Sequence, residues 1–141
     1  MRHLLALISG AAGGIFSLAA NAACSDGDWW SVAREYREAH LVFIGEVVAE
    51  RPDPGDGHWI AGTFYRLKVN EVFRGTARGQ IDLFSENSSG RFPMRRGVDY
   101  LVFASMCENR LFAYAKGNSE TVAASTTNLN KVRQLSARTG K

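Results

Sequence analysis

The chain has 141 residues, which is enough for one domain with a modest hydrophobic core and too few for two comfortable ones. Apolar residues make up 45% of it and charged residues 22%, which argues against a disordered chain. The formal net charge of +3 is too small to indicate a nucleic acid as the partner.

The N-terminal stretch has the pattern of a secretory signal peptide. Residues 1–3 are basic, residues 4–20 are small and apolar, and residues 20–22 form an A-x-A cleavage site, followed by a weaker site at 21–23. We predict a signal peptide over residues 1–23, a secreted or periplasmic protein, and no membrane attachment after signal removal. The two cleavage sites leave the mature N-terminus open between Ala23 and Cys24. A membrane anchor fits less well because the stretch is short and rich in glycine.

Two cysteines follow the predicted leader, Cys24 and Cys107. An even number of cysteines in an exported protein favours a disulfide, and two unpaired thiols are the alternative. Closing so long a loop would stabilise the fold by roughly 4–5 kcal/mol in the chain-entropy model. Neither cysteine has a neighbour at metal-ligand spacing, so we expect no metal site and no cofactor.

The first half of the mature chain begins with a predicted helix over residues 29–39, capped by Asp28 and with Tyr36 on its apolar face. Residues 40–50 form a long apolar, β-branched run interrupted by Gly45, which predicts a strand that bends or bulges there. Residues 51–57 are rich in proline, aspartate and glycine and predict a loop.

The rest of the chain alternates short apolar runs with polar turns. We predict strands over 60–74, 80–85, 99–104 and 111–115, a loop over 86–97, a hairpin loop over 105–110 that holds Cys107, and a C-terminal helix over 121–135. The fold is therefore mainly β, a small five-stranded barrel with a short helix before it and a helix after it. One domain spans 24–135, and residues 136–141 are predicted to be a disordered tail.

We find no catalytic constellation in the sequence, and we expect the protein not to be an enzyme. His40 begins the first strand, which favours a structural role, and His58 falls in a loop. Asp53 and Asp56 lie in a turn-rich segment, where turn formation accounts for them. The serines of residues 88–90 lack the strand–turn–helix context of a nucleophile.

Three segments, in this order, resemble the netrin-module superfamily and, within it, the bacterial group similar to tissue inhibitors of metalloproteinases. Residues 39–48, AHLVFIGEVV, are similar to its opening strand "ADLVFVGKVV". Residues 65–75, YRLKVNEVFRG, are similar to "Y-x-F-x-V-x-x-V-F-K-G", and residues 92–104 are similar to "G-x-P-F-x-x-G-x-x-YLVFA". The resemblance covers about residues 24–119 and implies an OB-type five-stranded barrel.

The resemblance implies an inhibitor of zinc metalloproteinases, and we expect the protein to be a monomer. The α-amino group and carbonyl oxygen of Cys24 would chelate the catalytic zinc of the protease, and Ser25 would enter the adjacent specificity pocket. The chain departs from the family pattern, because Asp26 replaces the second cysteine of Cys-x-Cys, and Ser89 and Lys116 lie near the positions of the two partner cysteines. A non-inhibitory extracytoplasmic netrin-like OB-fold module, used for binding or structure, is the alternative.

Overall fold

The computed structural model describes residues 30–140, which form six strands, two α-helices and one short 3-10 helix. In chain order these elements are α1 (Val32–Glu38), β1 (Leu41–Asp53), β2 (Gly62–Arg74), β3 (Gln80–Glu86), β4 (Asp99–Cys107), β5 (Arg110–Phe112), β6 (Glu120–Thr121), η1 (Val122–Ala124) and α2 (Thr126–Thr139).

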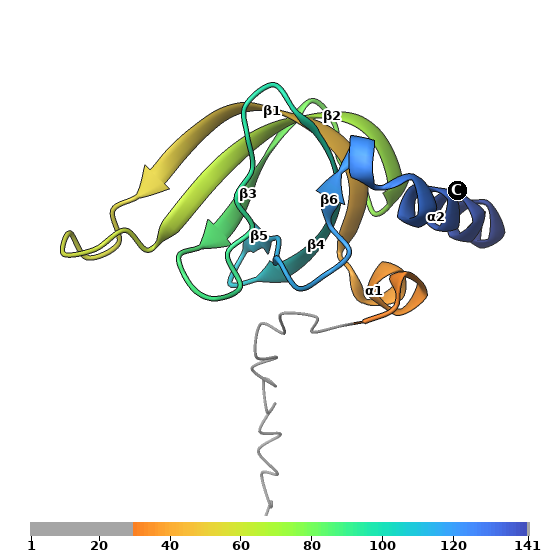
Figure 1. Ribbon diagram of the computed structural model, residues 1–141, viewed down its shortest axis with the longest axis horizontal. Coiled ribbons are helices and arrows are strands. Elements are labelled where there is room, and N and C mark those ends of the chain that lie inside the picture. The colour runs from red at the N-terminus through yellow and green to blue at the C-terminus, as the bar shows by residue number, and fades with distance from the viewer. Residues whose placement is uncertain (1–29, 141) are drawn as a thin grey trace, which may run out of the picture.

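Five of the strands close into a ring (Figure 1). The order is β1-β2-β3-β5-β4, and β4 pairs again with β1. All neighbouring strands are antiparallel except β3 and β5. β6 pairs with β4 at Tyr100 and Leu101. The prediction of a mainly β fold with five strands between two helices is therefore confirmed, whereas the two-residue strand β6 was not predicted.

The first part of β1, from Leu41 to Val47, is buried on both faces, which explains its largely apolar sequence. Leu41, Phe43 and Val47 point into the ring, while Val42 and Ile44 pack towards the helices. The register of β1 against β2 shifts at Gly45, as predicted. A Cβ atom at this position would lie 2.8 Å from the Phe43 ring. Because glycine has no side chain, the ring can pack directly against the backbone there.

The interior of the ring is filled by side chains that alternate along the strands. Tyr65 and Leu67 of β2 and Leu83 of β3 are all in this core. The segment between β3 and β4 was predicted as a loop and contains no strand. Two of its side chains, Phe92 and Met94, are nevertheless buried in the core, so this connection closes the interior as well as joining two strands.

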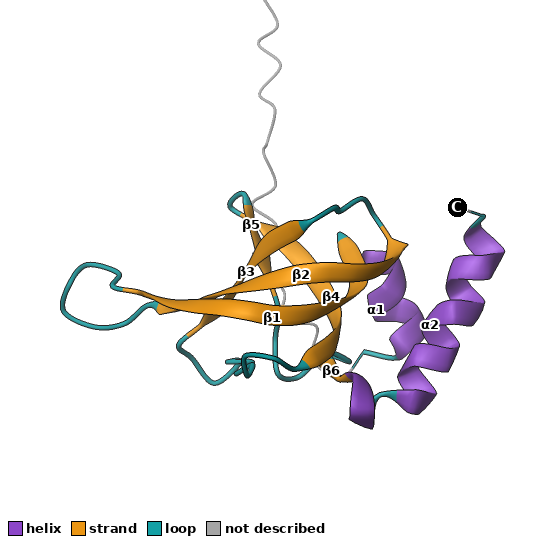
Figure 2. Cartoon of the chain, turned by 90° about the horizontal axis from the view of Figure 1, so that it is seen from above, coloured by secondary structure: helices purple, strands orange, loops and turns teal. Residues whose placement is uncertain are grey.

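The two helices lie side by side against the outside of the ring (Figure 2). Tyr36 of α1 and Leu129 and Val132 of α2 pack on the outward residues of β1, β2 and β4. One carbonyl of β2 joins both helices, because the oxygen of Phe73 accepts a hydrogen bond from the Tyr36 hydroxyl at 2.7 Å and from the Ser136 hydroxyl at 3.1 Å. None of the described helices is long and apolar enough to cross a bilayer.

We expect Tyr36→Phe and Ser136→Ala each to lower the free energy of unfolding by about 1 kcal/mol, the usual net value of one buried hydrogen bond. Because the two hydroxyls share one acceptor, the double variant should lose more than the sum of the single variants. Denaturant titration measures all three, with Thr127→Ala, an exposed hydroxyl on α2, as the control. Additive losses would show that the two helices are held independently.

Several predicted boundaries are wrong. α1 begins at Val32 and not at residue 29, and Ser31 is its N-cap, accepting a hydrogen bond from the Arg34 amide. The predicted cap, Asp28, lies outside the described residues. β1 continues through Asp53, because pairing with β2 persists into the segment predicted as a loop.

The C-terminal helix is also displaced from its prediction. It begins at Thr126, after η1, and continues through Thr139, past the predicted end at Leu135. Ser136, predicted to begin a disordered tail, is buried and bonded to Phe73. The prediction failed because the residues after Leu135 are small and polar, whereas this turn of helix is held by a tertiary hydrogen bond.

Candidate functional site

The residues predicted to form the inhibitory site fall in different parts of the chain. Cys24 and Ser25 lie outside the described residues. Cys107 is described, and it is the last residue of β4, paired with Arg110 of β5. The prediction that Cys107 lies in a hairpin loop is therefore wrong.

The turn after Cys107 explains this error. It consists of Glu108 and Asn109, which both have positive φ angles, 48° and 62°. Such two-residue hairpin turns usually carry glycine, and its absence here explains why a longer hairpin loop, over residues 105–110, was predicted. The two strands consequently continue closer to the turn than predicted, and the cysteine belongs to the rigid sheet.

Cys107 sits in an aromatic cluster on the outer surface of the ring, formed with Phe84, Phe112 and Tyr114. The cysteine is only 9% exposed and is not a free thiol in this structure. Phe84 meets Phe112 edge-on with a centroid distance of 5.2 Å, and Phe112 stacks on Tyr114 at 5.9 Å. Cys107 is therefore buried within a cluster whose rings pack on one another.

Two arginines cover the neighbouring part of this outer surface. The Arg51 guanidinium lies 4.5 Å from the Phe64 ring centroid, and Arg110 lies 5.5 Å from the same ring. Arg110 also contacts Asp53 at 3.6 Å. This group was not predicted from the sequence. Side chains alternate between the two faces of a strand, so Phe64 lies on the face of β2 opposite to Tyr65, which points into the ring.

A hydrogen-bonded network holds the first described residues against the connection between β5 and β6. The Asn118 side-chain amide donates to the Trp30 carbonyl at 2.9 Å and to the Glu35 carboxylate. The Asn118 backbone N–H donates to the same carboxylate at 2.7 Å. We call Trp30, Glu35 and Asn118 the N-terminal network. Sequence reasoning also missed it, because Glu35 and Asn118 are 83 positions apart.

Burial raises the pKa of Glu35 above its ordinary value, although the hydrogen bonds from Asn118 oppose this effect. A raised folded-state pKa gives stability that is complete below the unfolded value, near 4.5, and is lost as the pH rises through the folded pKa. We therefore expect the wild type to gain stability relative to Glu35→Gln as the pH falls from 7 to 4. Denaturant titration of both proteins at several pH values measures this difference, and a pH-independent difference would contradict the prediction.

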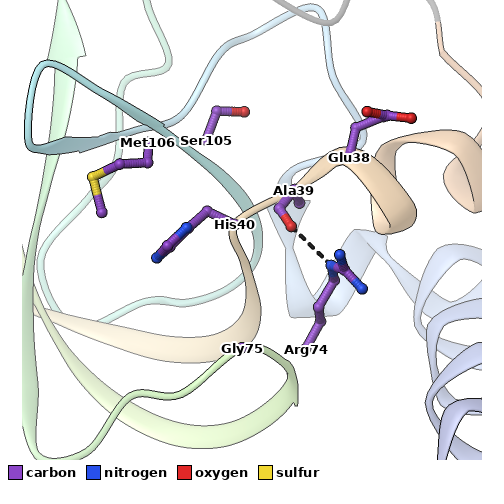
Figure 3. A pocket seen from close by; sticks show the side chains of 7 residues that line it. All are labelled: Glu38, Ala39, His40, Arg74, Gly75, Ser105 and Met106. Atoms are coloured by element: carbon purple, nitrogen blue, oxygen red, sulfur yellow. Dashed lines mark hydrogen bonds between the residues drawn. The ribbon is translucent and has the colours of Figure 1, made fainter.

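An open groove of about 600 Å³ lies between the end of α1, the turn after β2 and the end of β4 (Figure 3). His40 and Met106 lie along it, and the Arg74 side chain closes one wall by donating a hydrogen bond to the Ala39 carbonyl at 2.8 Å. Among the described residues, no three His, Cys, Asp or Glu side chains are grouped closely enough to hold a metal ion.

The β1–β2 hairpin extends away from the ring (Figure 2), and the loop that joins its two strands carries two exposed large apolar side chains. Trp59 is 58% exposed and Ile60 is 51% exposed. The turn interpretation of the aspartates is confirmed, since Asp53 accepts from the Gly55 amide and Asp56 from the His58 amide. Trp59 and Ile60 therefore come directly after turns that are stabilised by hydrogen bonds between aspartate side chains and the backbone.

Comparison with known proteins adds no further assignment. No protein-family model matches this chain, and a search of curated proteins finds no match.

Proposed function

We propose that this chain is an exported inhibitor of zinc metalloproteinases that acts through an N-terminal Cys24. A catalytic zinc keeps one coordination position for the attacking water. The α-amino nitrogen and carbonyl oxygen of Cys24 would occupy the zinc and displace that water, and the Ser25 side chain would enter the adjacent pocket. Both donors belong to the backbone, so the inhibitor needs no metal or cofactor of its own.

The observation that carries this proposal is the place of Cys107. It is buried in an aromatic cluster at the end of a strand, and the only other cysteine of the chain is Cys24. A Cys24–Cys107 disulfide would hold the N-terminal residue against a rigid part of the sheet. Because ordering a loose segment costs binding free energy, such a bond would favour tight inhibition.

The strand order supports a finer description of the fold, an OB-type barrel. The ring β1-β2-β3-β5-β4-β1 combines antiparallel neighbours with one parallel pair, β3 and β5. The long β1, shifted in register at Gly45, pairs with two different strands, which suits a small closed sheet. This description agrees with the family that the sequence resembles.

The test compares two recombinant proteins that differ only in their first residue, one beginning at Cys24 and one with an additional alanine before it. The protein that begins at Cys24 should inhibit at least one member of a panel of zinc metalloproteinase catalytic domains. The added residue removes the α-amino group from the zinc, so inhibition should weaken at least 100-fold. Equal inhibition by both proteins would refute chelation by the N-terminus.

The alternative function, a non-inhibitory extracytoplasmic binding module, is favoured by one observation. Trp59 and Ile60 are exposed on a hairpin tip whose backbone is fixed, because the Asn87 side-chain amide donates to the Ile60 carbonyl at 3.2 Å. Aromatic residues presented in this way are typical of contact surfaces. A module of this kind would inhibit none of the panel with either N-terminus, so the same assay separates the two functions.

A further inference from the structure

A second groove lies at the end of the ring where β3 and β5 end and β4 begins. It has a volume of about 620 Å³ and lies between the β3–β4 connection and the segment that leads from β5 into η1. The buried rings of Phe92 and Tyr100, which meet edge-on at a centroid distance of 5.8 Å, form its floor. Exposed small or apolar residues, Pro93, Ala115 and Ala124, lie along its sides. A hollow of this size with a mainly apolar lining, at the open end of a closed sheet, is typical of small-molecule sites.

The side of the groove that carries Pro93 is held by a hydrogen bond at each end. The Phe92 backbone N–H donates to the buried Ser85 hydroxyl at 2.8 Å. The Arg95 backbone N–H donates to the Tyr100 hydroxyl at 2.9 Å. Because this segment is already fixed on the sheet, a ligand would lose little binding free energy in ordering it.

The charges around the groove favour a negatively charged ligand. Arg95 is exposed and is the one positively charged side chain among the described residues that line the groove. The β3–β4 connection also carries Arg91 and Arg96 and no acidic residue, and none of these arginines forms an ion pair with another described residue. Glu120, on the opposite side, already accepts a hydrogen bond from the Asn128 side chain at 2.9 Å. The Arg95 guanidinium is therefore available to a carboxylate, which it can bind through two parallel hydrogen bonds.

We propose that this groove binds a small amphiphilic carboxylate, with its apolar chain on Phe92 and Tyr100 and its carboxylate on Arg95. The apolar floor provides affinity in proportion to the length of chain that it covers. Arg95 provides the selection for negative charge. The site consists of residues between 92 and 124 and does not involve Cys24, so it goes beyond the proposed function and does not depend on it.

The test titrates the mature chain with octanoate and follows the backbone amides by NMR. Octanoate should bind saturably, with chemical-shift changes confined to residues 92–95 and 115–124. Hexanoate has two methylene groups fewer and should bind about tenfold more weakly. Octylammonium has the same chain with the opposite charge and should bind at least about fivefold more weakly. Absence of saturable octanoate binding, or shift changes elsewhere on the domain, would overturn the proposal, and equal affinity for octylammonium would overturn the selection for an anion.

Three variants at exposed positions test the contacts without altering the core. Arg95→Gln keeps the backbone bond to Tyr100 and should weaken octanoate binding about fivefold. Arg96→Gln is the matched control, because this neighbouring arginine does not line the groove, and it should bind octanoate as the wild type does. Ala124→Leu places a larger side chain in the groove and should weaken binding at least tenfold. Wild-type affinity in Arg95→Gln, or in Ala124→Leu, would contradict the assigned site.

Discussion

Replacing Gly75 by alanine is expected to destabilise the fold by about 3 kcal/mol or more, because two costs combine at this position. Gly75 has a φ angle of +79°, a conformation that side chains disfavour. An added Cβ would also lie 2.5 Å from the His40 carbonyl oxygen. That carbonyl immediately precedes β1, whose pairing with β4 closes the ring, so the backbone there has little freedom to move.

Gly79 offers a matched control in the same β2–β3 connection. Its φ angle is +65°, and an added Cβ would meet no atom within 4 Å. Gly79→Ala should therefore show only the conformational cost, about 1 kcal/mol. Denaturant titration of the two variants separates the steric cost at Gly75 from the backbone cost. Equal losses would mean that the contact between Gly75 and His40 does not constrain the start of β1.

The second large effect concerns the proposed disulfide. Replacing Cys24 by serine should lower the free energy of unfolding by roughly 4–5 kcal/mol, because the unfolded chain loses a long covalent loop. Cys107→Ser should cost the same amount plus a smaller loss of packing, because Cys107 is buried in the aromatic cluster. The double variant should be no less stable than Cys107→Ser, because either single change already removes the bond.

Reduction of the wild type provides the control for these variants. Denaturant titration of the reduced protein should give the stability of Cys24→Ser, within the small cost of one hydroxyl replacing one thiol. A Cys24→Ser protein that unfolds at the wild-type denaturant concentration would contradict the pairing. In that case Cys107 would contribute to stability by packing alone.

The strands were predicted well because burial on one face gives an alternating apolar sequence and burial on both faces gives a continuous apolar run. The alternation of Tyr65 and Leu67 with polar neighbours gave the inward face of β2, and the continuous run from Leu41 to Ile44 gave the doubly buried β1. The bulge at Gly45 followed from the one residue in that run without a side chain.

Two of the features that were not predicted have a common physical cause, which is tertiary contact between distant segments. Ser136 extends α2 through a bond to Phe73, 63 positions earlier, and no local pattern reports this bond. The N-terminal network joins α1 to the connection after β5 in the same way. The hairpin after β4 was predicted, but its loop is shorter than predicted, because the positive φ angles at Glu108 and Asn109 occur without glycine.

The inhibitor proposal depends on the claim that the exported chain begins at Cys24 and that Cys24 pairs with Cys107. The intact mass of the exported protein, measured with and without thiol alkylation, tests this claim most directly. We predict a mass that begins at Cys24, unchanged by alkylation until the protein is reduced, and raised by two alkyl groups afterwards. A chain that begins at Ala23, or thiols that are alkylated without reduction, would contradict the claim.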